Sequence, residues 1–282
     1  MCCQTPVYIL TGVFFCKGKI MEKITSRENL KIKLLCKLIK SKKARFEHNL
    51  FVAEGLRLVL DALRSNVEIQ SIFVTQECID KNSKHINEFI LNDNNSFLIT
   101  KELSTYISDT QNPQGIYAIC KKLDKNVNID KIYNNGVFIC LCSLQDPGNV
   151  GTIIRTAEAF GIKHIIMTED CPDIFSPKVL RSTMGSAFRI NVITFEDAEK
   201  MVRTLKLNGV TTYAAVLNDK SIALGTFDFP QNSAVLIGNE ANGLSESIIK
   251  MCDSALHIPM KGSAESLNAA TAANIIMWEM TK

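Results

Sequence analysis

The sequence predicts an α/β protein of two units, and three observations lead to this prediction. Apolar runs of strand length alternate with segments of helical spacing through most of the chain. A stretch rich in Lys, Asp and Asn, residues 121–135, interrupts this alternation. Beyond it the apolar runs are continuous, which is typical of strands that are buried on both faces of a parallel sheet.

Length and composition are those of a globular protein with room for two domains. The chain has 282 residues, of which 46% are hydrophobic and 22% are charged, and a domain holds roughly 100–200 residues. No apolar run approaches the roughly 18 residues that a membrane span requires. We expect four segments: an extension that is disordered or untranslated over residues 1–26, a first domain over 27–122, a linker over 123–135 and a second domain over 136–282.

The first, smaller domain is predicted to be α/β. It begins with a basic helix over residues 27–43, because Leu30, Leu34 and Leu38 recur at helical spacing. Short strands and helices then alternate up to Lys121. The expected strands cover residues 50–52, 69–75, 96–100 and 117–121, and the expected helices cover 54–65, 86–91 and 101–107.

The second domain is predicted to hold a mostly parallel sheet with helices on both faces. Its strands are expected over residues 137–144, 162–167, 212–217, 234–237 and 255–258. A helix follows the first strand, with Ile153, Ile154 and Ala157 on one face and Gly161 at its end. We expect Asn149 to cap the N-terminus of this helix.

Three loop-to-helix segments follow strands of the second domain and are the candidates for a binding site. They cover residues 146–151, 236–245 and 258–268, with Ser245 capping the second helix and Ser263 or Ser266 the third. Each of them alone fits an ordinary turn or cap. Ligands of open α/β sheets bind at the carboxyl ends of strands, so the three segments together predict one pocket. The phosphate-loop, dinucleotide-binding and metalloprotease motifs are absent.

The ten cysteines indicate a reducing compartment rather than a disulfide framework. Cys140, Cys142 and Cys252 lie in apolar runs, where cysteine packs as a small apolar side chain. No Cys-x-x-Cys pair occurs and the four histidines form no ligand pattern, so we expect no disulfide and no metal site. A cytoplasmic location is the corresponding expectation.

Positive charge is concentrated near the N-terminus. Residues 17–45 contain eleven Lys or Arg and two acidic residues, a net charge of +9, whereas the whole chain carries +3. Such asymmetry favours a polyanionic partner, most simply nucleic acid, although a solvated basic helix without a partner explains it equally well. Lys42, Lys43 and Arg45 are the expected nucleic-acid contacts here, joined by Arg181 in the second domain.

Three motifs in a characteristic order give the sequence a specific resemblance. Residues 149–161, Asn-Val-Gly-Thr-Ile-Ile-Arg-Thr-Ala-Glu-Ala-Phe-Gly, resemble the first motif of the SpoU (TrmH-like) RNA 2′-O-ribose methyltransferases of the SPOUT superfamily. Residues 238–245 resemble the second motif, and residues 258–260 with 266–268 resemble the third. More loosely, residues 43–45 and 51–63 resemble the N-terminal substrate-binding domain of that family.

The resemblance implies a fold, a cofactor and an assembly. The second domain would contain a deep C-terminal trefoil knot, and the first would be a small α/β fold like ribosomal proteins of the L30e type. S-adenosylmethionine would be the methyl donor, and the protein would be a homodimer whose active site is built across the dimer interface. RNA and not DNA would be the partner, because the reaction requires a 2′-hydroxyl. No membrane partner is expected.

The resemblance also implies which residues form the site. Those with catalytic roles would be Arg155, Asn149, Glu240 and Asn268. Those binding the methyl donor would be Ile237, Gly238, Ile258, Met260, Ser266 and Leu267. In the family, the matching Arg is proposed to deprotonate the ribose hydroxyl. Because free Arg has a pKa above about 12, clamping an RNA phosphate is the physically easier role for Arg155.

The predicted function is methyl transfer to a ribose 2′-hydroxyl of RNA, either ribosomal RNA of the 23S type or transfer RNA. The alternative is a non-catalytic RNA-binding protein of the same fold, such as a resistance or ribosome assembly factor. A generic nucleotide-binding α/β protein is a third hypothesis, which the missing phosphate-loop motifs disfavour.

Overall fold

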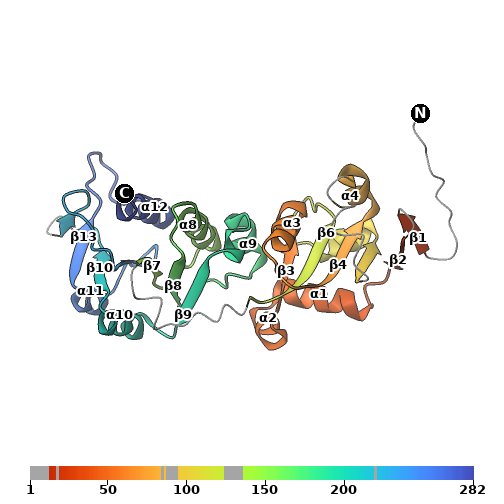
Figure 1. Cartoon of the computed structure of the whole chain (residues 1–282), viewed down its shortest axis with the longest axis horizontal. Helices are drawn as coiled ribbons and strands as arrows, with labels where there is room; N and C mark the ends of the chain where they lie inside the picture. Colours follow the sequence, from red (N-terminus) through yellow and green to blue (C-terminus); the bar gives the residue numbers. More distant parts are fainter. Residues whose placement is uncertain (1–12, 17–18, 84–85, 87–94, 124–135, 219–220) are drawn as a thin grey trace. The chain divides into compact units, whose positions relative to one another are not determined.

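The computed structural model describes residues 13–16, 19–83, 86, 95–123, 136–218 and 221–282. The chain divides into two compact units (Figure 1). Met1–Leu123 with Phe175–Pro177 form the N-terminal unit, and Asp124–Ile174 with Lys178–Lys282 form the C-terminal unit. Most of the expected linker, residues 124–135, lies outside the described residues.

The N-terminal unit is built on a mixed sheet of six strands in the order β1-β2-β5-β4-β6-β3. β2, β5 and β4 run parallel to one another, whereas β1, β6 and β3 are antiparallel to their neighbours. The strands are β1 Val13–Cys16, β2 Lys19–Ile24, β3 Leu50–Glu54, β4 Ile69–Thr75, β5 Ser96–Ile99 and β6 Ile116–Lys121. The four strands predicted from apolar runs are therefore confirmed.

Helices cover this sheet and close its core. They are α1 Leu30–Lys40, α2 Lys42–His48, α3 Leu56–Arg64, α4 Gln76–Lys81 and α6 Lys101–Ile107. The single helix predicted over residues 27–43 is instead divided at Ser41, whose hydroxyl accepts the N–H of Ala44 and caps α2. The predicted helix over residues 86–91 lies outside the described residues except for Ile86.

The structure differs from the expected N-terminal extension over residues 1–26. Lys19–Ile24 form β2, which pairs in parallel with β5. Met21 and Ile24 are buried, with 5% and 3% of their surface exposed. This segment has no strong local pattern, because its place in the sheet depends on a strand far along the chain. Residues 1–12 and 17–18 lie outside the described residues.

Arg45 is a structural residue, which corrects its predicted role as an RNA contact. It is only 4% exposed, and its Nη1 donates to the carbonyls of Leu38 at 2.7 Å and Ile39 at 3.2 Å. A cation at a helix C-terminus satisfies carbonyls that have no partner within the helix and interacts favourably with the helix dipole. Lys42 and Lys43 on the same helix are exposed, and their role as RNA contacts stays a prediction.

Replacing Arg45 with Met should destabilise the N-terminal unit, because buried carbonyls at the end of α1 lose their donor. We expect a loss of about 1–3 kcal/mol, measured by hydrogen exchange of amides in α1 and β3. Trp278 is the one tryptophan of the chain and lies in the C-terminal unit, so its fluorescence transition should not move. Lys43→Met is the exposed control, and unchanged exchange in Arg45→Met would contradict the assignment.

The C-terminal unit contains a parallel sheet of seven strands in the order β11-β13-β10-β12-β7-β8-β9. Every neighbouring pair in it is parallel, which confirms the predicted sheet type. The strands are β7 Val137–Leu141, β8 His164–Thr168, β9 Asn191–Phe195, β10 Thr211–Ala215, β11 Ile222–Ala223, β12 Ser233–Ile237 and β13 Ser254–His257. The sequence did not predict β9 and β11, because β9 is only partly buried and β11 has two residues.

Helices cover both faces of this sheet, as predicted. The helical segments are α8 Pro147–Ala159, α9 Pro177–Thr183, η1 Ser186–Phe188, α10 Ala198–Leu207, α11 Glu246–Met251 and α12 Ala269–Met280. α8 and α12 pack with Ile139 and Leu141 of β7 on one face. On the other face, α10 and α11 pack with Phe138 and Cys140 of the same strand. The core thus reflects the alternation of side chains along β7.

The described cysteines have free thiols: Cys36, Cys78, Cys120, Cys140, Cys142, Cys171 and Cys252. Burial raises the pKa of Cys120 to about 12 and that of Cys252 to about 11. These thiols are therefore protonated at neutral pH and pack as apolar side chains. Within the described residues, no group of three or more His, Cys, Asp or Glu side chains could hold a metal ion.

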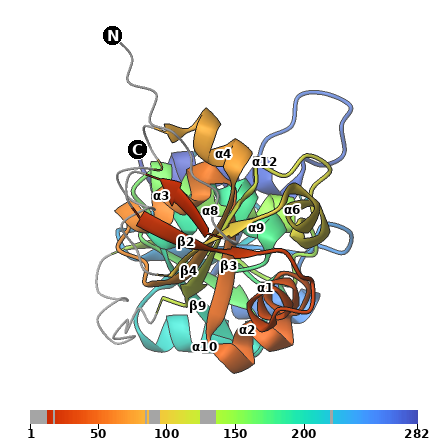
Figure 2. The same ribbon diagram turned by 90° about the vertical axis from the view of Figure 1, so that its right-hand side faces the viewer.

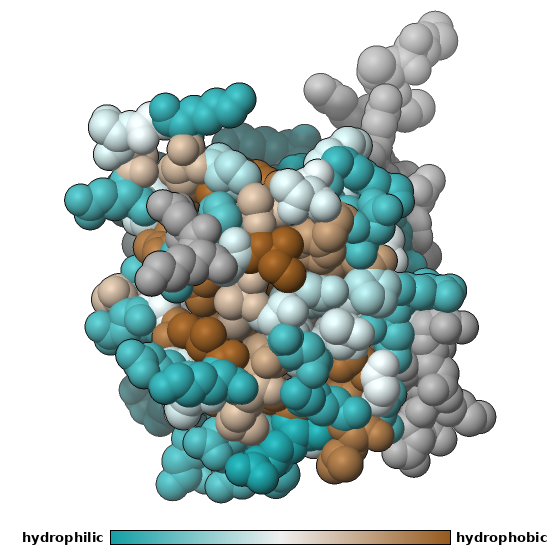
Figure 3. All heavy atoms as spheres, turned by 90° about the vertical axis from the view of Figure 1, so that its left-hand side faces the viewer, coloured by the Kyte–Doolittle hydropathy of each residue, from teal (hydrophilic) through white to brown (hydrophobic). Residues whose placement is uncertain are grey.

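The outer edge of the C-terminal sheet carries a mixed surface. Figure 3 faces the end at which β13 lies in Figure 1, and it shows apolar patches divided by polar side chains. β11, the edge strand next to β13, has only two residues. A short edge strand offers little backbone for pairing with another chain.

Among the described residues, no helix has the length and hydrophobicity needed to cross a membrane.

Candidate active site

Side chains from all three predicted loops meet at the carboxyl edge of the C-terminal sheet. Asn268 Nδ2 donates to Asn149 Oδ1 at 3.0 Å. Asn149 Nδ2 in turn donates to Glu240 Oε1 at 2.9 Å. We call this the Asn268–Asn149–Glu240 chain. It joins the loops that follow β13, β7 and β12, so the structure brings three of the four predicted catalytic residues into direct contact.

Glu240 is the acceptor at the end of this chain. Its Oε2 accepts the backbone N–H of Gln145 at 2.9 Å, and its Oε1 accepts that of Asp146 at 3.1 Å. Partial burial acts to raise the pKa of Glu240, but the hydrogen bonds from the Asn149 side chain and from backbone N–H groups outweigh it. The pKa is therefore lowered from its ordinary value, and the carboxylate is ionised at neutral pH.

Helix caps explain why the two asparagines are free to form the chain. Asp146, and not Asn149 as predicted, caps α8, because its Oδ1 accepts the N–H of Gly148 and Asn149. Asn149 therefore lies inside the first turn, with its amide directed away from the helix backbone. The combination of Asp146 with Pro147 at the first helical position is the signal that could have identified this start.

Asn268 has two roles at the start of α12. Its Oδ1 accepts the N–H of Ala270 at 2.9 Å and caps the helix, while its Nδ2 donates to Asn149. The predicted caps Ser263 and Ser266 are both wrong, since the helix begins after them. Ser245 caps α11 as predicted.

A tight turn at Gly238 shapes the loop after β12. The backbones of Asn239 and Gly243 exchange hydrogen bonds of 3.1 and 2.9 Å. A Cβ on Gly238 would lie 2.3 Å from the carbonyl carbon of Gly243, so no other residue fits there. Asn239 Nδ2 also donates to the carbonyl of Ser143 at 2.8 Å. This second bond between the loops after β12 and β7 was missed by the sequence analysis.

Arg155 lies on α8, the helix that carries Asn149, and is exposed. No described residue forms an ion pair or a hydrogen bond with its guanidinium. Glu158, three residues further on, is already engaged by Arg189 Nε at 2.9 Å and the Ser186 hydroxyl at 3.1 Å. The Arg155 guanidinium is therefore available for an anion from outside the chain.

The predicted donor-binding residues lie on the same three loops or the strands before them. Ile237 is buried at the end of β12, while Gly238, Ile258 and Leu267 are half-buried. Met260 and Ser266 are exposed in the loop between β13 and α12. Arg181 lies on α9, where it is partly buried.

Comparison with known proteins identifies the family. Residues 136–278 match the model of the SpoU rRNA Methylase family. The chain belongs to this family. Residues 29–118 match the MRM3-like substrate binding domain, so the N-terminal unit carries the domain that the resemblance suggested.

Full-length relatives share both units. The 23S rRNA (guanosine(2553)-2′-O)-methyltransferase RlmP of Bacillus subtilis is 31% identical over 262 residues, which are 92% of this chain and 99% of that protein. An AdoMet-bound rRNA methyltransferase from Sinorhizobium meliloti is 29% identical and superposes with a TM-score of 0.76, covering 92% of this chain and 97% of the other. The SpoU methyltransferase AviRb from Streptomyces viridochromogenes, 24% identical with a TM-score of 0.76 over 90% of this chain and 96% of its own, shares the fold.

Replacing Asn149 with Ala should raise the pKa of Glu240 toward its ordinary value of 4.5, because one of the hydrogen bonds that lower it is lost. A lowered pKa in the folded state means that this interaction is complete above the ordinary pKa and is lost as the pH falls through the folded value. Carboxyl carbon NMR titration of Glu240 measures the shift. Asn242→Ala, an exposed neighbour, is the control, and equal titration midpoints in the Asn149→Ala variant and the wild type would refute the prediction.

Proposed function

We propose that this protein transfers a methyl group from S-adenosylmethionine to a ribose 2′-hydroxyl of ribosomal RNA. The observation that carries the proposal is the Asn268–Asn149–Glu240 chain, which joins the three family motifs by hydrogen bonds. The unpaired Arg155 lies on α8, the helix that carries Asn149. Ribosomal RNA is favoured over transfer RNA because the RlmP relative acts on 23S rRNA and matches both units. A non-catalytic RNA-binding protein would not require this hydrogen-bonded set of residues together with Arg155.

The residues present fit a bound methyl donor. The ends of β12 and β13 and the start of α12 carry Gly238, Ile258 and Leu267, and hydrogen bonds hold the loops after β7, β12 and β13 at one edge. When bound, S-adenosylmethionine supplies an electrophilic methyl group. Ile237 packs into the core at the end of β12, and the backbone of the Gly238 turn offers hydrogen-bonding groups to the donor without a side chain in the way.

Arg155 orients the RNA in this proposal. Its guanidinium, which stays protonated, binds an RNA phosphate through charge-assisted hydrogen bonds and so fixes the position of the neighbouring ribose. Holding the hydroxyl in line with the methyl group accounts for much of the rate, because orientation removes an entropic barrier. Transfer would break the bond between the methyl carbon and the donor's sulfur and leave S-adenosylhomocysteine, and the hydroxyl proton would pass to water late in the reaction.

The active form is proposed to be a homodimer. Ile275 and Trp278 on α12 are 38% and 58% exposed, an unusual position for large apolar side chains on a helix rich in small residues. Phe160, just after α8, lies 5.7 Å from the Trp278 ring. A second copy covering this surface would bury these side chains. The trefoil knot, the L30e-like fold of the first domain and the cytoplasmic location remain predictions.

Incubating the protein with radiolabelled S-adenosylmethionine and total RNA from a strain that lacks its gene tests the proposed function. Nucleoside analysis should place the label in a 2′-O-methylnucleoside, and size fractionation should place it in the large ribosomal RNA. Label on a base would overturn the proposed reaction. Label in the transfer RNA fraction would overturn the proposed substrate.

The Arg155→Ala variant should lose at least about a hundredfold of methyl transfer while keeping its affinity for S-adenosylmethionine, because the guanidinium acts on RNA rather than on the donor. Single-turnover transfer and calorimetric donor binding measure the two effects. Arg203→Ala, an exposed arginine on α10, is the matched control. A normal transfer rate in Arg155→Ala would rule out this role.

The Arg189→Gln variant should slow transfer by releasing Glu158, which can then pair with Arg155 one helical turn away. We expect a loss of roughly three- to tenfold in kcat/KM for RNA. Adding Glu158→Gln removes the competing carboxylate and should restore the rate. A double variant that is as slow as Arg189→Gln alone would show that Arg189 does not act through Arg155.

A further inference from the structure

The N-terminal unit has one partly exposed aromatic ring with two positive charges close to it. Tyr106 on α6 is 42% exposed, whereas Phe51, Phe73 and Tyr117 of the same unit are fully buried. Arg27 Cζ lies 4.5 Å from the centroid of the Tyr106 ring, and Lys40 Nζ lies 5.9 Å from it. α1, which ends with Lys40, and α6 lie side by side (Figure 2). We call these three residues the Tyr106 surface.

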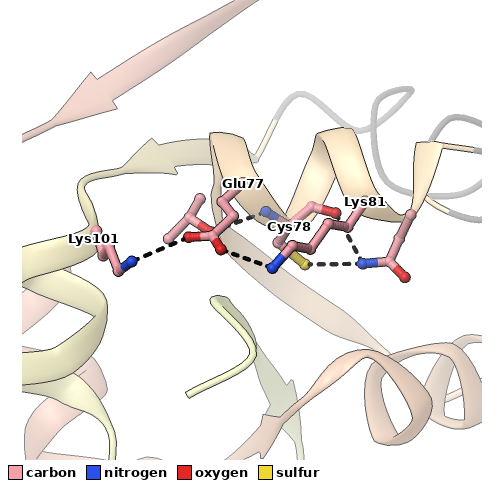
Figure 4. A network of polar contacts seen from close by, with 6 residues as sticks. Glu77, Cys78, Lys81 and Lys101 are labelled. Atoms are coloured by element: carbon pink, nitrogen blue, oxygen red, sulfur yellow. Dashed lines mark hydrogen bonds and ion pairs between the residues drawn. The ribbon is translucent and has the colours of Figure 1, made fainter. Parts of the chain in front are cut away.

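Several cations of the N-terminal unit are paired with carboxylates, but these two are not. Lys81 and Lys101 both contact Glu77, at 2.8 and 3.5 Å (Figure 4). Lys33 pairs with Glu28 in the same way. Within the described part of the chain, neither Arg27 nor Lys40 has an acidic partner. The Tyr106 surface therefore combines positive charge that no carboxylate offsets with a ring that is partly exposed beneath it.

An unpaired RNA nucleotide is the ligand that satisfies both features. Its base offers a flat face for stacking on tyrosine, and its phosphate offers the negative charge that two converging cations lack. A duplex presents only phosphates, because its bases are already stacked on both faces. We propose that the Tyr106 surface binds single-stranded RNA, with an unpaired base on Tyr106 and flanking phosphates at Arg27 and Lys40.

The proposal rests on the proposed function, since that function makes RNA the substrate, and it names the part of the RNA that the N-terminal unit holds. The Tyr106 surface also replaces part of the sequence-based assignment, which placed the RNA contacts on α2. Arg45 there is buried, and Lys43 lies 3.7 Å from Glu47. The Tyr106 surface uses the end of α1 and the segment before it, which belong to the same basic region of the sequence.

Fluorescence anisotropy of the full chain with a labelled ten-nucleotide oligouridine and with a ten-base-pair RNA duplex tests the proposal. Tyr106→Leu should weaken binding of oligouridine by at least about fivefold and leave the duplex unchanged, while Tyr106→Phe keeps the ring and stays within about twofold. Phe46→Leu is the matched control, because Phe46 is also an exposed aromatic residue, 80% exposed, beside a lysine. An equal loss for both RNAs, or a loss only with Phe46→Leu, would overturn the proposal.

The charges are tested separately, so the test does not depend on how the Tyr106→Leu variant folds. The Arg27→Gln/Lys40→Gln double variant should reduce the slope of log affinity against log salt by about 1.4 for single-stranded RNA, or roughly 0.7 for each phosphate contact. Lys200→Gln/Arg203→Gln on α10 should not change it. An unchanged slope in the first double variant would overturn the phosphate contacts.

Methyl transfer, measured in parallel, separates this proposal from the proposed function. If the wild-type protein methylates ribosomal RNA but oligouridine binding is indifferent to Tyr106→Leu, the surface assignment fails alone. If Tyr106→Leu weakens oligouridine binding but no RNA is methylated, the proposed function fails alone.

Discussion

The carboxylate of Glu240 is the point on which the candidate site depends. It accepts the N–H groups of Gln145 and Asp146 and the amide of Asn149, which in turn accepts from Asn268. Asn149 is 91 residues from Glu240 and 119 residues from Asn268 in sequence. Without this shared acceptor, the loops after β12 and β7 would lose three of the hydrogen bonds between them and would keep the one from Asn239 to Ser143. A single carboxylate that accepts from several donors is therefore what joins three separate turns into one site.

Local backbone chemistry makes the shared acceptor possible. Asp146 caps α8 and Asn268 caps α12 with a single oxygen, so the amides of Asn149 and Asn268 remain available for side-chain contacts. Gly238 lets the loop after β12 turn back on itself within a space that a Cβ would fill. These caps and this turn are local features, but a site built on strand ends and helix N-termini is held rigidly by the sheet.

Much of the fold was predictable, because the signals were local. Continuous apolar runs predicted the parallel strands of the C-terminal unit, and Gly161 marks the end of α8 as expected. The predictions failed where the answer depended on distant partners. β2 is a strand because β5 pairs with it, and Arg45 is buried because the carbonyls at the end of α1 need its guanidinium. Asn149 looked like a cap because the signal of Asp146 followed by Pro147, which marks the true start of α8, was not applied.

The candidate site was predictable as a set of residues but not as a geometry. The motifs named Asn149, Glu240 and Asn268, yet only the structure shows that they contact one another directly. Gln145 and Asp146 could not be predicted as partners of Glu240, because they contribute backbone N–H groups that no residue type reveals. The contacts of Asn239 and Arg189 were missed for a related reason, since their partners lie in other loops or helices.

A double-mutant cycle on Asn149 and Asn268 tests most directly whether the three loops act as one unit. Asn149→Ala removes the shared amide, and Asn268→Ser keeps a capping oxygen while removing the amide donor. Calorimetry would measure the affinity of each variant for S-adenosylmethionine. The account predicts a coupling free energy of about 0.5–3 kcal/mol between the two sites. Additive losses would show that the loops hold the donor independently and would contradict it.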